Sequence, residues 1–262
     1  MVFDIGGTKT RFAISKDLNS FESEPTVFYT KNNYQEELAE LNNLLKNKEI
    51  EKCCGGIAGI IENGVLKFSP NLPDFVNKNI LQDFKNILNC NNIVIKNDAQ
   101  MAALGEYSFG SGKGYSSICY LTLGTGIGGG IVINGKLQNS QFFEPGHMIA
   151  NIDSNKSFEE LISGGAIRKA FNGNIPQKED RDFWLNIEKQ LAVIVLNIFM
   201  IYPVDSFILG GGIVTRGNID IKSVSSFFKE FSRVKYAPII KTNQLDDFSG
   251  LYGALQSLRS NI

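Results

Sequence analysis

The sequence is poor in the residues that build metal sites and disulfide frameworks. Its 262 residues include one histidine, His147, one tryptophan and four cysteines. No two of the cysteines form a C-x-x-C pair, so they are not spaced as a zinc knuckle. The adjacent pair lies inside an apolar run, and we therefore expect reduced, mostly buried thiols at Cys53, Cys54, Cys90 and Cys119.

An excess of charge of one sign is also missing. The chain carries 26 Lys and Arg against 27 Asp and Glu, interspersed, for a net charge of −1. Without a basic stripe, a nucleic-acid ligand is not expected. No apolar run approaches the ~20 residues that cross a bilayer, and a strand-like segment follows Met1 directly, which leaves no room for a signal peptide. These features predict a cytoplasmic protein that binds neither nucleic acid nor membrane.

The patterns along the chain are typical of an α/β protein large enough for two modest lobes. Short apolar strands alternate with amphipathic helices, such as Tyr34–Lys48, whose leucines recur every three or four residues. A longer helix is predicted over residues 182–201, because it stops at Tyr202-Pro203. A terminal helix is predicted from about Leu251.

Two segments of the chain share one design. Residues 4–14 and residues 123–133 each contain a strand, a Gly/Thr turn and a returning strand, with the second turn expected over Gly124–Gly130 and a hairpin signal at Asn134-Gly135. This internal repeat predicts two related lobes, each with a glycine-rich tip facing a common cleft. We assign residues 1–98 plus about 248–262 to the first lobe and 99–247 to the second.

The glycine-rich tips are suited to phosphate, because glycine lets backbone N–H groups converge on an oxyanion. Residues 124–129 match G-x-G-x-x-G, but that dinucleotide fingerprint must open a helix and here a strand follows. The P-loop pattern G-x-x-x-x-G-K-[ST] does not occur. Tight turns without a ligand are the alternative, but the second matched tip and Gly210–Gly212 argue against it.

Seven short motifs follow one another along nearly the whole chain. They are Asp4-Ile-Gly-Gly-Thr-Lys9, Pro70-Asn71-Leu72-Pro73, Asn97-Asp98-Ala99, Leu123-Gly-Thr-Gly-Ile-Gly-Gly-Gly130, Glu144-Pro-Gly-His147, Glu159 before Ser163-Gly164, and Leu209-Gly-Gly-Gly-Ile213. Each motif is weak alone, but together and in this order they resemble the ROK (repressor, open reading frame, kinase) family specifically. The resemblance implies an α/β fold with two actin-like, ribonuclease-H-like lobes of the hexokinase type, in which sugar and ATP meet between the lobes.

The resemblance also implies roles in the acceptor half of the cleft. Asp98 matches the general base that takes a proton from the sugar hydroxyl as its oxygen attacks the γ-phosphate. A carboxylate suits that role, since phosphoryl transfer needs alignment, charge neutralisation and a positioned base. The alternative is that Asp98 is a helix N-cap, because it stands where a strand ends and a helix begins. The implied sugar-binding set is Asn71, Asn97, Asp98, Glu144, His147 and Glu159.

For the donor half, the resemblance implies ATP and Mg²⁺ as cofactors. Asp4 matches the carboxylate that reaches Mg²⁺ through water, an ion that keeps waters and takes few protein ligands. Phosphate contacts are implied for Gly6, Gly7, Thr8, Lys9, Thr125 and Gly126, and adenosine contacts for Gly211 and Gly212.

The sequence departs from the family pattern in three places. Most members carry a cysteine-rich zinc loop after the histidine, whereas residues 151–157 are short and contain no cysteine. We therefore expect no structural zinc, which leaves open what orients His147. Ala58 stands where a turn of the family usually has proline, a minor change. Family repressors begin with a helix-turn-helix domain, and this chain begins at the phosphate strand, which disfavours the repressor branch.

Together these features predict ATP-dependent phosphorylation of a hexose or N-acetylhexosamine, namely glucose, N-acetylmannosamine or N-acetylglucosamine, at the 6-hydroxyl. Fructose is an alternative acceptor. Two other classes stay open: a catalytically inactive sugar sensor of the same family, and an acetate-kinase-like or chaperone-like ATPase on the same fold. The last would leave the Glu144–His147 motif unexplained. Because the family commonly forms dimers, we expect a homodimer.

Overall fold

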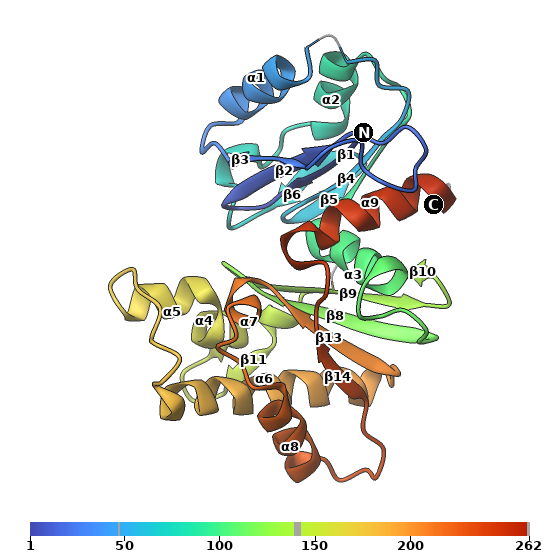
Figure 1. Cartoon of the computed structure of the whole chain (residues 1–262). Helices are drawn as coiled ribbons and strands as arrows, with labels where there is room; N and C mark the ends of the chain where they lie inside the picture. The colour runs from blue at the N-terminus through green and yellow to red at the C-terminus, as the bar shows by residue number, and fades with distance from the viewer. Residues whose placement is uncertain (47, 139–142, 261–262) are drawn as a thin grey trace.

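Two five-stranded sheets form the frame of the protein (Figure 1). The computed structural model describes residues 1–46, 48–138 and 143–260. The first sheet has the order β3-β2-β1-β4-β7, with β1 (Val2–Ile5), β2 (Lys9–Ala13), β3 (Thr26–Tyr29), β4 (Cys53–Ile57) and β7 (Ile93–Asn97). The second has the order β10-β9-β8-β13-β14, with β8 (Ser117–Leu123), β9 (Ile127–Ile133), β10 (Lys136–Leu137), β13 (Ser206–Gly210) and β14 (Ile239–Thr242).

The two sheets repeat one topology. In the first, β1 pairs antiparallel with β2 and parallel with β4; in the second, β8 pairs antiparallel with β9 and parallel with β13. The outer strands continue the pattern, because β2–β3 and β9–β10 are antiparallel and β4–β7 and β13–β14 are parallel. The predicted repeat is therefore a duplication at the level of whole sheets. Asn134 and Gly135 have φ values of 50° and 76°, which suit the predicted two-residue hairpin turn between β9 and β10.

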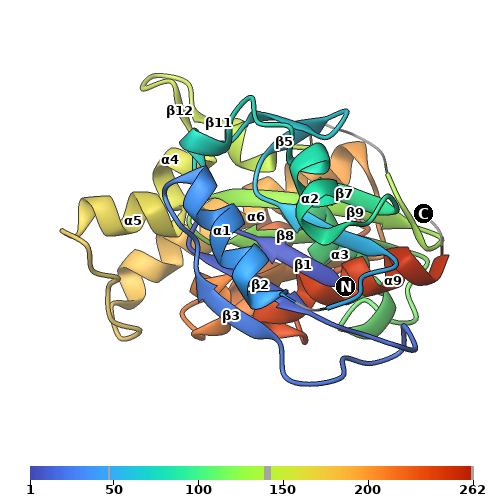
Figure 2. The same ribbon diagram turned by 90° about the horizontal axis from the view of Figure 1, so that it is seen from above.

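Helices cover the sheets in layers (Figures 1 and 2). α1 (Tyr34–Leu44) and α2 (Ile80–Leu88) lie over the outer face of the first sheet, while α6 (Arg181–Ile201) and α8 (Ile221–Phe231) lie over that of the second. α3 (Asp98–Phe109) and α9 (Ser249–Ser260) lie between the sheets. The shorter elements are β5 (Ile60–Glu62), β6 (Val65–Phe68), β11 (Ile149–Asn151), β12 (Lys156–Ser157), α4 (Phe158–Ile162), α5 (Gly164–Ala170), α7 (Gly212–Thr215) and the 3₁₀ turns η1 (Pro73–Phe75), η2 (Pro145–His147) and η3 (Asp246–Phe248).

Alternation of side chains along the strands divides the interior into three cores. In β1, Val2 joins the core between the sheets and Phe3 the outer core under α1 and α2. In β8, Ile118 joins the middle core and Cys119 the outer core under α6. This period of two buries both faces of each sheet. The middle core, built from both sheets with α3 and α9, joins the lobes.

α3 and α9 cross at very short range, and two glycines make that possible. A Cβ atom on Gly253 of α9 would overlap the carbonyl oxygen of Met101, and one on Gly105 of α3 would overlap that of Ser249. Since both obstacles are backbone atoms, relief would require a helix to move. The crossing therefore fixes how the two lobes are joined.

Several sequence expectations are corrected by the fold. β9 begins at Ile127, so the glycines at 128–130 lie in a strand, where Gly128 and Gly130 let α3 pack closely at Ala99 and Ala103. α1 ends at Leu44 instead of Lys48, and α9 begins two residues earlier than predicted.

The expectation that no apolar segment reaches membrane-spanning length is wrong for α6. Its 21 residues are long and apolar enough by length and composition. A core helix meets the same test, and half of the most apolar window of α6 is buried inside the protein. Trp184, Leu191 and Val195 of this helix belong to the core of the second lobe.

Replacing Gly253 by alanine tests the helix crossing. Alanine favours a helix over glycine by up to about 1 kcal/mol, so propensity alone predicts stabilisation. The overlap with Met101 should outweigh this and lower the stability by about 2–3 kcal/mol, as overpacking of a close contact does. Urea unfolding gives the comparison, with Gln256→Ala on the same helix as the control. A Gly253→Ala protein as stable as the wild type would contradict the crossing as described.

Candidate active site

A cleft of about 490 Å³ lies between the two sheets. Its walls include both glycine-rich hairpin tips, the loop after β6, the start of α3, η2, α4 and the turn after β13. Every residue predicted for the site from the sequence lines this cleft: Asp4, Gly6, Gly7, Thr8, Lys9, Asn71, Asn97, Asp98, Thr125, Gly126, Glu144, His147, Glu159, Gly211 and Gly212.

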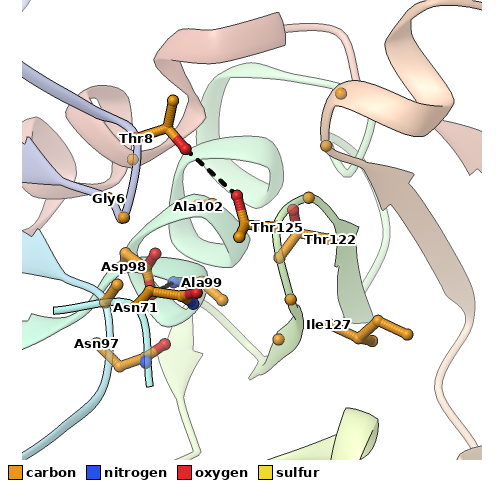
Figure 3. Close-up of a pocket in the computed structure, with 18 of the residues that line it drawn as sticks. Gly6, Thr8, Asn71, Asn97, Asp98, Ala99, Ala102, Thr122, Thr125 and Ile127 are labelled. Atoms are coloured by element: carbon orange, nitrogen blue, oxygen red, sulfur yellow. Dashed lines mark hydrogen bonds between the residues drawn. The ribbon is translucent and has the colours of Figure 1, made fainter. Parts of the chain in front are cut away.

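Asp98 is the first residue of α3, at the end of β7. The alternative that it serves as the N-cap is wrong, because Asn97 fills that position: its Oδ1 accepts from the Gln100 amide at 3.1 Å. The Asn97 Nδ2 donates to Gly59 O at 3.0 Å, and the Asp98 Oδ1 accepts from the Ala99 amide at 2.9 Å. In Figure 3, Asn97, Asp98 and Asn71 lie close together on one wall of the cleft. The capping function therefore does not account for a carboxylate at Asp98.

Three carboxyl groups in the cleft have raised pKa values. Burial raises the pKa of Asp98 to about 6, although the Ala99 amide and the charge of Arg11 oppose the change. Burial likewise raises the pKa of Asp4 to about 7, against the neighbouring Arg11. For Glu144, burial again is the main cause of a pKa of about 7, with His147 opposing it. A cluster of carboxyl groups with perturbed pKa values is typical of a functional site.

The sugar end of the predicted site is held by short elements. Glu159 in α4 accepts from the Ile127 amide at 2.7 Å, which ties its carboxylate to the start of β9. His147 lies in η2, and its ring makes an edge contact with Phe68, 6.3 Å between centroids. Phe68 lines the cleft and is 45% exposed, and sequence reasoning missed it. The Phe68 ring is therefore one group that lies beside His147, whose surroundings the sequence left open.

The two hairpin tips meet at the phosphate end. Thr8 Oγ1 and Thr125 Oγ1 lie 3.3 Å apart, so hydroxyls from both lobes face the same space (Figure 3). The Gly6 amide donates to Lys9 O at 3.0 Å, which means that it closes its own turn. Gly6 therefore shapes the tip, and the threonine hydroxyls are the donors that face across it.

An ion-pair network that sequence reasoning missed lies beside the first tip. Arg11 contacts Asp4 at 3.2 Å and Asp247 at 3.0 Å, and Lys9 contacts Asp247 at 3.3 Å. Asp4 and Arg11 are directly opposite in the β1–β2 register, so the hairpin pattern contained a signal for that pair. Nothing near Asp247 in the sequence indicated that it joins them.

The turn between β13 and α7 forms the far end of the cleft. Gly211 has a φ of 86°, and a Cβ there would lie 2.6 Å from the backbone carbonyl of Leu123, so glycine is required. Gly212 faces open space. Arg168 and Arg216 also line the cleft, and no motif marked them.

The donor set fits Mg²⁺ better than a protein-enclosed metal. Among residues 1–46, 48–138 and 143–260, no three His, Cys, Asp or Glu side chains are grouped to hold a metal. Asp4 offers one carboxylate in the cleft, and Mg²⁺ takes one or two carboxylates with phosphate oxygens and waters. The four cysteines are free and buried, as predicted.

Comparison with known proteins identifies the family. The sequence model of the ROK family matches residues 1–260. The chain belongs to the ROK family. A ROK family glucokinase from Streptomyces griseus, solved with glucose and AMPPNP, superimposes with a TM-score of 0.82 at 22% identity over 98% of each chain. That likeness confirms the predicted two-lobed, hexokinase-type fold.

Several curated relatives of this ROK protein are named as sugar kinases, among them a glucokinase and an N-acetylgalactosamine kinase. A glucokinase from Thermotoga maritima is 29% identical over 60% of this chain and 62% of its own length, which is less than two thirds of that protein. The N-acetylgalactosamine kinase AgaK from Shewanella sp. is 29% identical over 70% of this chain and 67% of its own length.

The Asp98→Asn variant tests whether burial in the cleft disfavours the ionised form of Asp98. The folded pKa of about 6 exceeds the ordinary 3.8, so the folded protein binds this proton more tightly than the unfolded chain does. The contribution of Asp98 to stability therefore falls as pH rises from about 4 through 6. The variant should melt above the wild type at pH 8 and equally near pH 4. Asp153→Asn, at an exposed position, is the control; a melting difference independent of pH would contradict the assignment.

Proposed function

We propose that the protein transfers the γ-phosphoryl group of ATP to the 6-hydroxyl of a hexose or N-acetylhexosamine, with Asp98 as the general base. At the level of reaction class, the chain is a sugar kinase. The observation that carries the finer proposal is Asp98 itself: a carboxyl group with a pKa of about 6, in the cleft where both hairpin tips meet the predicted sugar-binding residues.

The acceptor half works through hydrogen bonds and one proton transfer. Asn71, Glu144, His147 and Glu159 supply donors and acceptors for the ring hydroxyls, and Asn97 keeps one amide hydrogen after its two structural bonds. Asp98 accepts the proton of the attacking hydroxyl. A base with a pKa near 6 is ionised at neutral pH and still binds the proton well enough to assist the attack.

The donor half neutralises the phosphates. The Thr8 and Thr125 hydroxyls and the Lys9 ammonium bind the terminal phosphate, and Gly211 and Gly212 line the part of the cleft assigned to adenosine, where Gly212 faces open space. Asp4 would hold Mg²⁺ through water, and the ion, when bound with ATP, offsets charge on the phosphate oxygens. Little more is needed, because phosphoryl transfer depends on alignment and charge stabilisation.

The proposed lobes comprise residues 1–98 plus about 248–262 and residues 99–247. α3 of the second lobe and α9 of the first lie between the two sheets and are the elements about which the lobes would close on a sugar. A cytoplasmic location agrees with free, buried thiols and with a reaction that consumes ATP. We propose a homodimer because members of the family commonly form dimers.

The choice of acceptor separates the remaining candidates. The names of the two relatives divide between glucose and an N-acetylhexosamine, and fructose is the runner-up. A sugar sensor without catalysis would bind sugar and leave ATP intact. The enzyme is favoured because the residues predicted for catalysis and for phosphate binding are all present and line the same cleft.

An ADP-release assay with Mg-ATP, over a panel of hexoses and N-acetylhexosamines, tests the proposal. We expect one sugar to be preferred, and Asp98→Asn to lower kcat at least about a hundredfold while it still binds that sugar, because only the base is lost. Asp153→Asn should keep full activity. Near-normal turnover by Asp98→Asn would remove the assigned base, and sugar binding without any turnover by the wild type would favour the sensor.

The pH profile gives a second test. Since Asp98 must be ionised to act, kcat/KM should fall as pH drops through about 6, by about tenfold per unit below it. Protonation of Asp4 and Glu144 at pH about 7 would broaden this limb toward neutrality. A rate that stays constant from pH 8 to pH 5 would exclude all three as groups that must be charged.

A further inference from the structure

The segment 243–249 runs from β14 to α9 and carries Asp247 to the first hairpin. Asp247 Oδ2 accepts from Lys9 Nζ at 3.3 Å and from Arg11 Nη2 at 3.0 Å. One carboxylate oxygen therefore engages both cations of the β1–β2 hairpin, from a residue more than 230 positions away in sequence. Both cations and Asp247 line the cleft.

The same segment is held from its other side by a buried carboxylate. Glu106 of α3 is fully buried and accepts from the Gln244 amide at 3.1 Å, the Leu245 amide at 2.9 Å and the Ser249 hydroxyl at 2.8 Å. Since α3 begins at Asp98, the helix that positions the proposed base also positions Asp247. The proposed base, Asp98, and the two cations, Lys9 and Arg11, are therefore linked through α3 and the segment that carries Asp247.

Arg11 depends on this arrangement more than Lys9 does. Its side chain is 12% exposed, and its Nη1 donates to Asp4 at 3.2 Å. Its Nε is buried with no hydrogen-bond partner in the described part of the chain. Removing the Asp247 carboxylate would leave a second donor of a largely buried guanidinium unpaired, which is costly, and Arg11 would have to move.

We propose that Asp247 is a positioning residue for the phosphoryl donor: it fixes Lys9 and Arg11 at the base of the first hairpin tip, so that Lys9 meets the terminal phosphate of ATP in one defined place. This inference rests on the proposed function, because the donor it concerns is Mg-ATP. Lys9 retains 42% exposure beside Asp247, which leaves its ammonium accessible to a phosphate that enters the cleft.

A purely electrostatic role and a positioning role for Asp247 predict opposite changes in the KM for Mg-ATP when this residue is replaced by asparagine. If Asp247 only adds negative charge near the triphosphate, its removal should tighten Mg-ATP binding and lower the KM. If Asp247 positions Lys9 and Arg11, its removal should raise the KM for Mg-ATP and lower kcat, because a misplaced cation no longer meets the phosphate. The direction of the change in KM therefore decides between them.

The chain offers a matched control in the neighbouring residue. Asp246→Asn removes the same charge one position away; the Asp246 side chain makes no hydrogen bond or ion pair within the described residues, and its φ of 47° suits asparagine. We expect Asp247→Asn to raise the KM for Mg-ATP about fivefold and to lower kcat about tenfold, with the KM for sugar unchanged. Asp246→Asn should leave the KM for Mg-ATP unchanged or lower it, and Asp247→Glu should recover most of the loss.

Binding of Mg-AMPPNP, measured by calorimetry, tests the inference without turnover. A Kd that rises about fivefold for Asp247→Asn and not for Asp246→Asn supports it. An equal or lower Kd for Asp247→Asn, or an Asp247→Glu variant no better than Asp247→Asn, overturns it. Should the wild type bind Mg-AMPPNP but phosphorylate no sugar, the proposed function fails, while the comparison of Kd values still decides the role of Asp247.

A double-mutant cycle with Lys9→Met covers the case in which Asp247→Asn loosens the fold. If Asp247 acts through Lys9, its substitution should change the Kd for Mg-AMPPNP far less in the Lys9→Met background than in the wild type. Equal changes in both backgrounds would overturn the inference, since Asp247 would then act independently of Lys9.

Discussion

The close crossing of α3 and α9 is the constraint on which the rest of the structure depends. Gly105 and Gly253 let the two backbones meet between the sheets, and the middle core forms around that contact. α3 carries Asp98 at its start and Glu106 near its end, so any shift of this helix moves both the proposed base and the segment that holds Asp247. The geometry of the cleft is therefore set by the packing of these two helices.

The cleft keeps carboxyl groups where burial opposes their charge. Asp4, Asp98 and Glu144 all have raised pKa values because of burial, although Asp4 is paired with Arg11. Burying carboxyl groups lowers the stability of the folded protein at neutral pH, where the groups must ionise. A general base nevertheless benefits from partial burial, because its pKa then lies closer to the working pH. The same physical property thus accounts for the cost in stability and for the proposed catalysis.

Much of this was readable from the sequence because local patterns carried it. The repeat of residues 4–14 in residues 123–133 predicted two sheets with matching hairpins, and the motifs predicted residues that all line one cleft. Most of what failed depended on contacts between distant segments, and the helix cap depended on the local backbone angles. Gly128 and Gly130 lie in β9 and serve helix packing instead of the turn. Asn97 takes the cap position in place of Asp98 because its φ and ψ suit that position. Asp247 lies far from Arg11 in sequence, so only the folded chain brings them together.

The distribution of charge along the cleft also restricts the acceptor. Asp98, Glu144 and Glu159 belong to the proposed sugar-binding set, whereas Lys9 and Arg11 lie at the first hairpin tip and Arg168 and Arg216 also line the cleft. An acceptor that carried its own phosphate or carboxylate would bring a further negative charge beside three carboxyl groups, which Coulomb repulsion opposes. A neutral sugar instead offers hydroxyl donors to those same carboxylates. The acceptor end is therefore matched to an uncharged polyol ring, and the negative charge of the reaction belongs to the donor side.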